Sequence, residues 1–226
     1  MSRMRTLTAL GAASALAALM ATTAGAATVL SLDGGISGQI PGGASNEALP
    51  ALGLANPLDG YFGAQVLLDN KAKVTVTLLG AEAGFMNTFR YDPTGDTLVL
   101  GGTSAAGTWN AAGIDSLDLG VVDAGLLSFS FLTDGNGGKS VTNGTNPTNA
   151  NPNVANFFAS FVGDATGRSG TSLYLFFDDT GGGADDNHDD LLVRVDIAPV
   201  PVPAAGFLLL GGLGVLGALS RRRKSA

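Results

Sequence analysis

The chain has 226 residues, with 12 basic and 19 acidic side chains and no cysteine. Without cysteine, disulfide bonds and thiol catalysis are excluded. Within residues 27–199 only six side chains are basic and 19 are acidic, a formal net charge of −13. Such a surface repels DNA, RNA and anionic lipid, so nucleic-acid binding is not expected.

The first 26 residues are typical of a secretory signal peptide. Arginines near the start precede an apolar stretch at residues 7–20, which small residues follow. This order of charged, apolar and small residues is that of an export signal. We expect cleavage after Ala26, with Ala27 as the neighbouring choice. The part that remains, residues 27–199, has the size of one domain with its own core.

Residues 27–199 are rich in Gly, Thr, Ser, Asn and Asp, with short apolar runs between turn residues. This pattern is typical of an all-β domain, and no helix of useful length is predicted. Residues 73–78 alternate polar and apolar side chains, the period of a strand with one wet face. The predicted strands lie at residues 28–32, 64–68, 73–79, 85–91, 97–100, 117–122, 126–132, 156–161, 172–177 and 191–197.

Three pairings between neighbouring strands are expected. Residues 69–70 (Asp-Asn) separate two apolar runs and predict a hairpin. The sequence Asp-Pro-Thr-Gly at residues 92–95 is strong turn chemistry and predicts a second hairpin. Residues 117–122 and 126–132 are expected to form the third pair.

Two long stretches are expected to be loops. Residues 33–57 hold several Gly and Pro turn signals, and residues 134–153 are rich in Gly, Asn and Thr without periodicity. About ten short strands with turns between them indicate a single β-sandwich, of jelly-roll type.

The one dense group of chemically active residues lies at residues 177–191. Six carboxylates and an asparagine occupy a glycine-rich loop between two apolar strands. Like charges this close repel, and a cation that prefers oxygen ligands would relieve the repulsion; calcium takes about 6–8 oxygens from flexible loops. The candidate ligands are Asp178, Asp179, Asp185, Asp186, Asn187, Asp189 and Asp190.

Other interpretations of this loop stay open. It is no EF-hand, because Asp190 stands where that motif needs glycine, and a solvated acidic hairpin is the alternative to a calcium site. His188 is the single histidine and is typical of a solvated residue or a metal neighbour, so no Ser-His-Asp catalysis is predicted. A secreted hydrolase built on two carboxylates stays a third alternative.

Trp109, the single tryptophan, is either a ligand contact or a packing residue.

The last 27 residues, 200–226, form a three-part tail. A proline motif precedes an apolar run at residues 205–219 and a basic cluster. As a helix, residues 204–219 span only about 24 Å at about 1.5 Å per residue, less than the roughly 30 Å of a bilayer core. We therefore expect a temporary membrane anchor, with an ordinary membrane tail as the alternative. The motif is Val200, Pro201, Val202, Pro203 and Ala204, and the basic cluster is Arg221, Arg222, Arg223 and Lys224.

This tail resembles the PEP-CTERM class of bacterial sorting signals. The sequence Val-Pro-Val-Pro-Ala is similar to the VPLPA variant, with Val202 in place of leucine. The resemblance implies export, transient anchoring in the inner membrane through a transmembrane helix, and cutting near the proline motif by an exosortase-type membrane protease. The released domain would then reach the cell surface or the extracellular matrix.

Residues 173–195 and 79–89 also resemble segments of the DUF4114 type of β-domain, which implies a fold and no reaction. Together these patterns predict a non-enzymatic exported surface or matrix protein. The alternative is a calcium-dependent binding module for exopolysaccharide or other envelope components.

Overall fold

The computed structural model describes residues 28–101 and 108–200. The predicted signal peptide with its cleavage site at Ala26 and Ala27 lies outside the described residues. So do the apolar run at residues 205–219 and the remaining tail residues Pro201, Val202, Pro203, Ala204, Arg221, Arg222, Arg223 and Lys224. Within the described ranges, no helix is long and apolar enough to cross a membrane.

The described residues fold as antiparallel β-structure, so the predicted all-β class is confirmed. The larger sheet has nine strands in the order β11-β1-β2-β10-β12-β13-β3-β6, and β7 pairs with β2 beside this path. Its strands are β1 (Leu30–Ile40), β2 (Leu58–Leu68), β3 (Ala72–Ala81), β6 (Asn110–Val122), β7 (Gly125–Leu126), β10 (Asn156–Phe161), β11 (Ser169–Gly170), β12 (Ser172–Asp178) and β13 (Leu191–Pro199).

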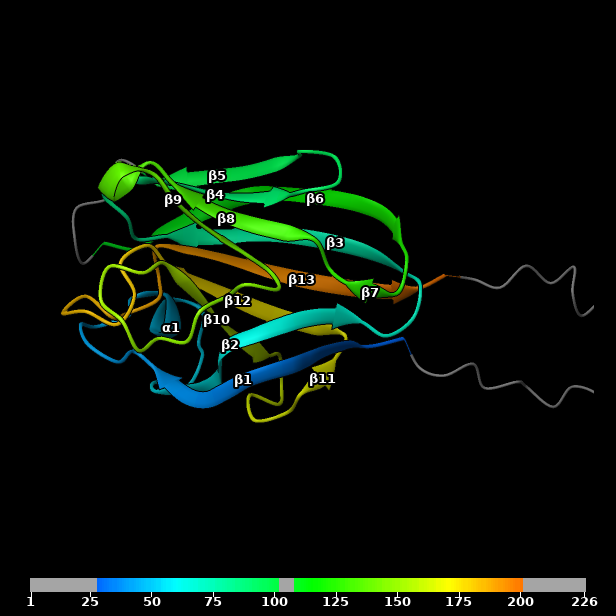
Figure 1. Ribbon diagram of the computed structural model, residues 1–226, viewed down its shortest axis with the longest axis horizontal. Coiled ribbons are helices and arrows are strands. Elements are labelled where there is room, and N and C mark those ends of the chain that lie inside the picture. The colour runs from blue at the N-terminus through cyan, green and yellow to red at the C-terminus, as the bar shows by residue number, and fades with distance from the viewer. Residues whose placement is uncertain (1–27, 102–107, 201–226) are drawn as a thin grey trace, which may run out of the picture.

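The smaller sheet has four strands in the order β5-β4-β8-β9 (Figure 1). They are β4 (Met86–Tyr91), β5 (Thr97–Gly101), β8 (Phe129–Thr133) and β9 (Lys139–Thr142). The described helical segments are short: α1 (Ala48–Ala51) and a 3-10 turn, η2 (Gly135–Gly137).

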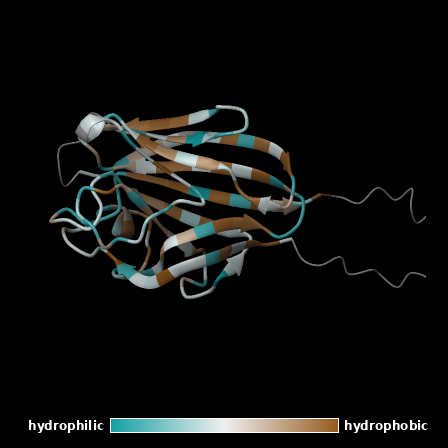
Figure 2. Ribbon diagram, viewed as in Figure 1, coloured by the Kyte–Doolittle hydropathy of each residue, from teal (hydrophilic) through white to brown (hydrophobic). Residues whose placement is uncertain are grey.

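The main core joins side chains of the two sheets. Phe131 of β8 stacks on Phe177 of β12, with ring centroids 5.0 Å apart and planes 6° apart. Phe129 of β8 contacts Phe157 of β10 at a centroid distance of 5.5 Å. Because side chains alternate between the faces of a strand, one set of apolar residues from each sheet enters this core. The alternating bands along the strands in Figure 2 show this pattern.

A second, smaller core covers the opposite face of the larger sheet. Phe158 of β10 and Phe176 of β12 point into it and meet Leu49 of α1. Both faces of β10 are therefore covered, and all six of its residues are buried. This double burial explains why apolar residues stand at the consecutive positions 157–159 of this strand instead of alternating with polar ones.

One of the three predicted strand pairings is confirmed and two are wrong. β4 pairs with β5 across residues 92–95. However, β2 pairs with β1 and β10, whereas β3 pairs with β13 and β6, so residues 69–70 join two strands that are not neighbours. Likewise β6 lies beside β3, and β8 lies in the other sheet. Alternation marks a strand and its buried face, but it carries no information about the partner strand.

The two predicted loops are partly ordered as strands. β1 continues to Ile40, so the first eight residues of the stretch 33–57 are strand. Residues 134–153 contain η2 and β9. Asn143 in this stretch is buried, and its side chain forms three hydrogen bonds to backbone groups: Oδ1 accepts from Val66 N, while Nδ2 donates to Val66 O and Leu127 O. The prediction failed because β9 is only four residues long, too short for a visible alternation, and it pairs with β8.

Both ends of the described chain lie at the same end of the domain, which we call the terminal end. There β1 begins and β13 ends (Figure 1). The opposite end, the loop end, carries α1 and the connection between β12 and β13 (Figure 1).

Candidate functional site

The acidic stretch predicted as a site is the connection from β12 to β13. The two strands pair antiparallel with Phe177 opposite Leu191, and residues 179–190, after the last residue of β12, form one long excursion at the loop end. This loop is no solvated hairpin, because Asp178, Asp179, Asn187, His188 and Asp189 are buried.

Residues 42–49 hold the loop in place from one side. The backbone N–H groups of Gly42 and Gly43 both donate to the carbonyl of Asp186 at 2.8 Å. A Cβ on Gly43 would lie 2.9 Å from the backbone nitrogen of Asp186, which explains the glycine at this close approach. Asn46 Nδ2 donates to the carbonyl of Asn187 at 2.6 Å, and Asn46 Oδ1 accepts from Leu49 N at the start of α1.

Asp178, Asp186 and His188 form a first group, which we call the histidine cluster. One ligand atom of each lies within 4.8 Å of the others. His188 Nδ1 is 3.2 Å from Asp186 Oδ1 and 3.5 Å from Asp178 Oδ2. Asp178 Oδ1 accepts from Thr180 N at 2.7 Å, so Oδ2 is the oxygen that faces the imidazole.

His188 is completely buried, contrary to the solvated interpretation drawn from its acidic neighbours. Its ring meets Phe62 edge-on, with centroids 5.2 Å apart. Nε2 donates to Oδ1 of Asn156 at 2.8 Å, because Asn156 already uses its amide nitrogen toward Asn149. Nδ1 therefore faces the two carboxylates.

Asp179 and Asp190 form a separate pair on the side of the smaller sheet. Asp190 Oδ2 accepts from the backbone N–H of Asp179 at 2.8 Å. Asp179 Oδ2 is 3.3 Å from the Thr133 hydroxyl, which donates to it. Asn87 Nδ2 donates to the carbonyl of Asp190 at 3.1 Å. These contacts join the loop to β4 and β8.

Asp189 meets two glutamates from distant parts of the chain, Glu47 before α1 and Glu82 after β3. We call these three residues the carboxylate cluster. One oxygen of each lies within 4.8 Å of the others. Asp189 Oδ2 accepts from Glu47 N at 2.9 Å, and the Asp189 carbonyl accepts from Glu82 N at 2.8 Å.

The remaining predicted ligands do not face a common point. Asp185 is exposed, and its Oδ1 accepts from Asn187 Nδ2 at 3.3 Å. The structure thus divides the seven predicted ligands among several surroundings. Asp178 and Asp186 join His188, Asp179 joins Asp190, and Asp189 joins Glu47 and Glu82. Neither glutamate was predicted as a ligand, because nothing local in the sequence marks either as a neighbour of Asp189.

Burial raises the pKa of most carboxyl groups in this region. It raises the pKa of Asp178 and of Asp179, the latter also through the charge of Asp178. Burial, together with the charges of Asp179 and Asp178, raises the pKa of Asp190 well above its usual range. The pKa of Asp189 rises to about 8, mainly through burial and also through Glu82 and Glu47.

Asp186 is the exception. Burial alone would raise the pKa of this carboxyl group, but hydrogen bonds from His188 and Asn149 outweigh it and lower the pKa. Asn149 Nδ2 donates to Asp186 Oδ1 at 2.7 Å. In the histidine cluster, a negative charge is thus favoured on Asp186 rather than on Asp178.

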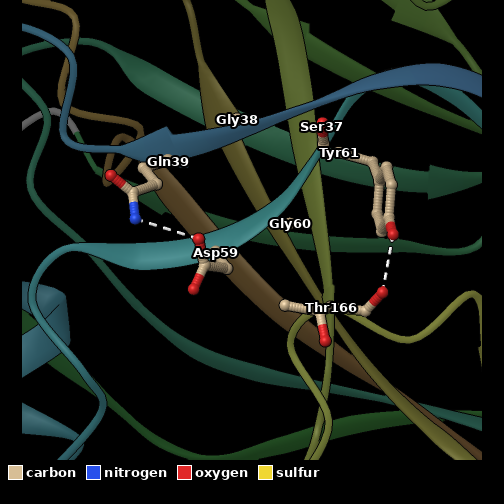
Figure 3. A pocket seen from close by; sticks show the side chains of 7 residues that line it. All are labelled: Ser37, Gly38, Gln39, Asp59, Gly60, Tyr61 and Thr166. Atoms are coloured by element: carbon tan, nitrogen blue, oxygen red, sulfur yellow. Dashed lines mark hydrogen bonds between the residues drawn. The ribbon is translucent and has the colours of Figure 1, made fainter.

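A pocket of about 210 Å³ lies apart from the acidic loop and is lined by the paired strands β1 and β2 and by Thr166 (Figure 3). Gln39 Nε2 donates to Asp59 Oδ1 at 2.9 Å, and the Tyr61 hydroxyl donates to the carbonyl of Thr166 at 2.6 Å. The guanidinium of Arg168 lies over the Tyr61 ring, 4.2 Å from its centroid. Tyr61 is buried and covered by this cation, so its ring is no open platform for a sugar.

Trp109 packs, partly buried, against the second core. The structure therefore places it as a packing residue.

Comparisons with family models, with curated proteins and with solved structures found no match for this chain. The interpretation of the site consequently depends on its own geometry.

Proposed function

We propose that this chain is an exported, non-enzymatic bacterial surface or extracellular-matrix protein. In this proposal the tail at residues 200–226 anchors it transiently in the inner membrane, and an exosortase-type membrane protease cuts near the proline motif. The observation that carries the proposal is the order of proline motif, short apolar run and basic cluster behind a domain that follows an export signal.

The fold is compatible with this arrangement. β13 ends at Pro199, directly before the proline motif, and it ends at the terminal end (Figure 1). A domain anchored there would turn its loop end away from the membrane. We further propose that the two sheets form a jelly-roll-like β-sandwich, which the shared aromatic core of Phe131 and Phe177 supports.

Mass spectrometry of the protein made in a host with the processing enzyme tests the proposal. We expect the mature protein to begin near Ala27 and to end near the proline motif. A variant with Pro201→Ala and Pro203→Ala should keep its tail, because proline no longer restricts the backbone of the motif that the protease recognises. Pro93→Ala, in an exposed turn, is the matched control and should be processed normally. Residues 205–226 on every copy of the native protein would overturn the proposal.

A second candidate function is calcium-dependent binding of exopolysaccharide or another envelope component. The observation in its favour is the number of buried carboxylates that meet at the loop end, which would be displayed away from an anchored terminal end. The full-length chain should be retained on immobilised host exopolysaccharide in millimolar calcium and released by EDTA. Equal retention in both buffers would rule out a calcium-dependent module.

A further inference from the structure

Three carboxylates from three separate segments converge at the loop end. Glu47 precedes α1, Glu82 follows β3, and Asp189 lies in the loop before β13. An oxygen of each lies within 4.8 Å of the others. All side chains of this carboxylate cluster offer oxygen alone, which is the ligand type that calcium and magnesium prefer.

A second observation points to a ligand at this place. Asp189 is completely buried, and its Oδ1 accepts no N–H or hydroxyl hydrogen bond from any described residue. Oε2 of Glu47 is also buried and accepts no hydrogen bond in the described part of the chain. No basic side chain of the described residues pairs with either carboxylate. An acceptor oxygen that is buried without a donor is unfavourable, and more so when it is charged.

We propose that Glu47, Glu82 and Asp189 bind one divalent cation, calcium. Carboxylates can ligate through one or both oxygens, so three of them supply between three and six of the roughly 6–8 oxygens that calcium takes, and water supplies the rest. Asp178 Oδ2 and His188 Nδ1 of the histidine cluster also lack a hydrogen-bond partner among the described residues, but this cluster is a weaker candidate for calcium because it offers an imidazole nitrogen in place of a third carboxylate.

The position of the cluster says what the cation does. Glu47 N donates to Asp189 Oδ2, and Glu82 N donates to the Asp189 carbonyl, so three segments already touch through Asp189. A cation among their carboxylates closes the loop end by joining α1 to the edge of the main core. Because Leu49 of α1 is buried in the second core, the bound cation also stabilises the packing of α1 against that core.

This assignment deepens the calcium-dependent candidate function but does not depend on export or on tail processing. The competing explanation is a proton held between Glu82 and Asp189, which would also reduce the repulsion. The two explanations differ in one observable: a shared proton leaves the protein indifferent to calcium at neutral pH, whereas the cation site does not.

The test is calorimetric titration of CaCl2 into the purified full-length chain in mild detergent, after EDTA treatment. We expect one calcium per chain with Kd in the range of roughly 10⁻⁴–10⁻³ M, as in other extracellular calcium modules. Glu47→Gln and Asp189→Asn should each weaken binding by about tenfold or more, because each removes a ligand charge. Asp185→Asn, in the same loop but exposed, is the matched control and should bind like the native chain.

If Asp189→Asn fails to fold, the site is tested on Glu47→Gln instead. The melting temperatures of this variant and of the native chain are measured with and without calcium. Glu47 is only partly buried, so Glu47→Gln is expected to fold and to lose the calcium-induced rise. No binding by the native chain, or native binding by Glu47→Gln, would overturn the site. Loss of calcium binding in Asp178→Asn but not in Glu47→Gln would place the ion in the histidine cluster and also overturn it. Calcium binding without exopolysaccharide binding would uphold the site and reject only the binding module.

Discussion

Replacing Asn143 with leucine is expected to lower the free energy of unfolding by about 3–5 kcal/mol. Leucine has nearly the shape of asparagine, so the change removes hydrogen bonds without opening a large cavity. Val66 N and Leu127 O lose the partner that Asn143 supplies, whereas Val66 O still accepts from Leu127 N at 3.0 Å. Each buried group left unsatisfied is unfavourable by about 1–3 kcal/mol. A loss of this size is a large part of the roughly 5–15 kcal/mol of a typical domain.

Urea denaturation of the native chain and the variant, followed by tryptophan fluorescence, measures this loss. Trp109 is the single tryptophan and packs on the second core, so it reports on unfolding of the larger sheet. Asn151→Ala is the control, because Asn151 is exposed and should change stability by less than about 0.5 kcal/mol. An Asn143→Leu variant as stable as this control would show that the side chain is not needed to join β2 to the segment after β9.

Raising the pH from about 5 to about 8.5 in EDTA is expected to destabilise the protein by on the order of 4 kcal/mol. The pKa of Asp189 is about 8 in the folded chain and near 3.8 in the unfolded chain. A raised pKa means that the folded state binds more protons between these values, so its stability falls as the pH rises through that interval. One pKa unit corresponds to about 1.4 kcal/mol, which gives the size of the effect. Asp178, Asp179 and Asp190 act in the same direction.

Asp186 does not oppose this trend within the interval. Its pKa is lowered, so its contribution to stability is lost only at pH values below its usual range. Asp189→Asn is the matched variant: it removes the titrating group that faces Glu47 and Glu82, and its unfolding free energy should vary less with pH. Stability that rises between pH 5 and pH 8.5 in the native chain, measured by urea denaturation, would contradict the prediction.

The sequence predicted the class of the fold but not its pairing. Alternation at residues 73–78 and the turn at 92–95 were enough to place β3, β4 and β5, because those signals are local. The partners of β2 and β3 could not be predicted, since both strands bury one face in the same core and either could lie beside several others. β9, just before Asn143, was missed because its four residues are too few to show a strand period among the surrounding turn residues.

The candidate site shows the same division between local and distant information. The loop with its carboxylates was visible in the sequence, and its calcium remains a prediction. Neighbouring residues in an irregular loop point to different places, so Asp178 faces His188 whereas Asp189 faces Glu47 and Glu82. The glutamates lie more than 100 residues before Asp189 along the chain. Only the folded arrangement of α1, β3 and β13 brings them together.

The place of β13 in the larger sheet has a mechanical consequence. β13 is hydrogen-bonded on both sides, to β12 and to β3, and it ends at Pro199. Tension applied through Val200 would therefore enter an inner strand and run along its axis. The bonds to both neighbours lie across that direction, so they would be strained together in shear rather than opened one after another. A domain pulled through its last described residue in this way should unfold at a higher force than a domain pulled through an edge strand.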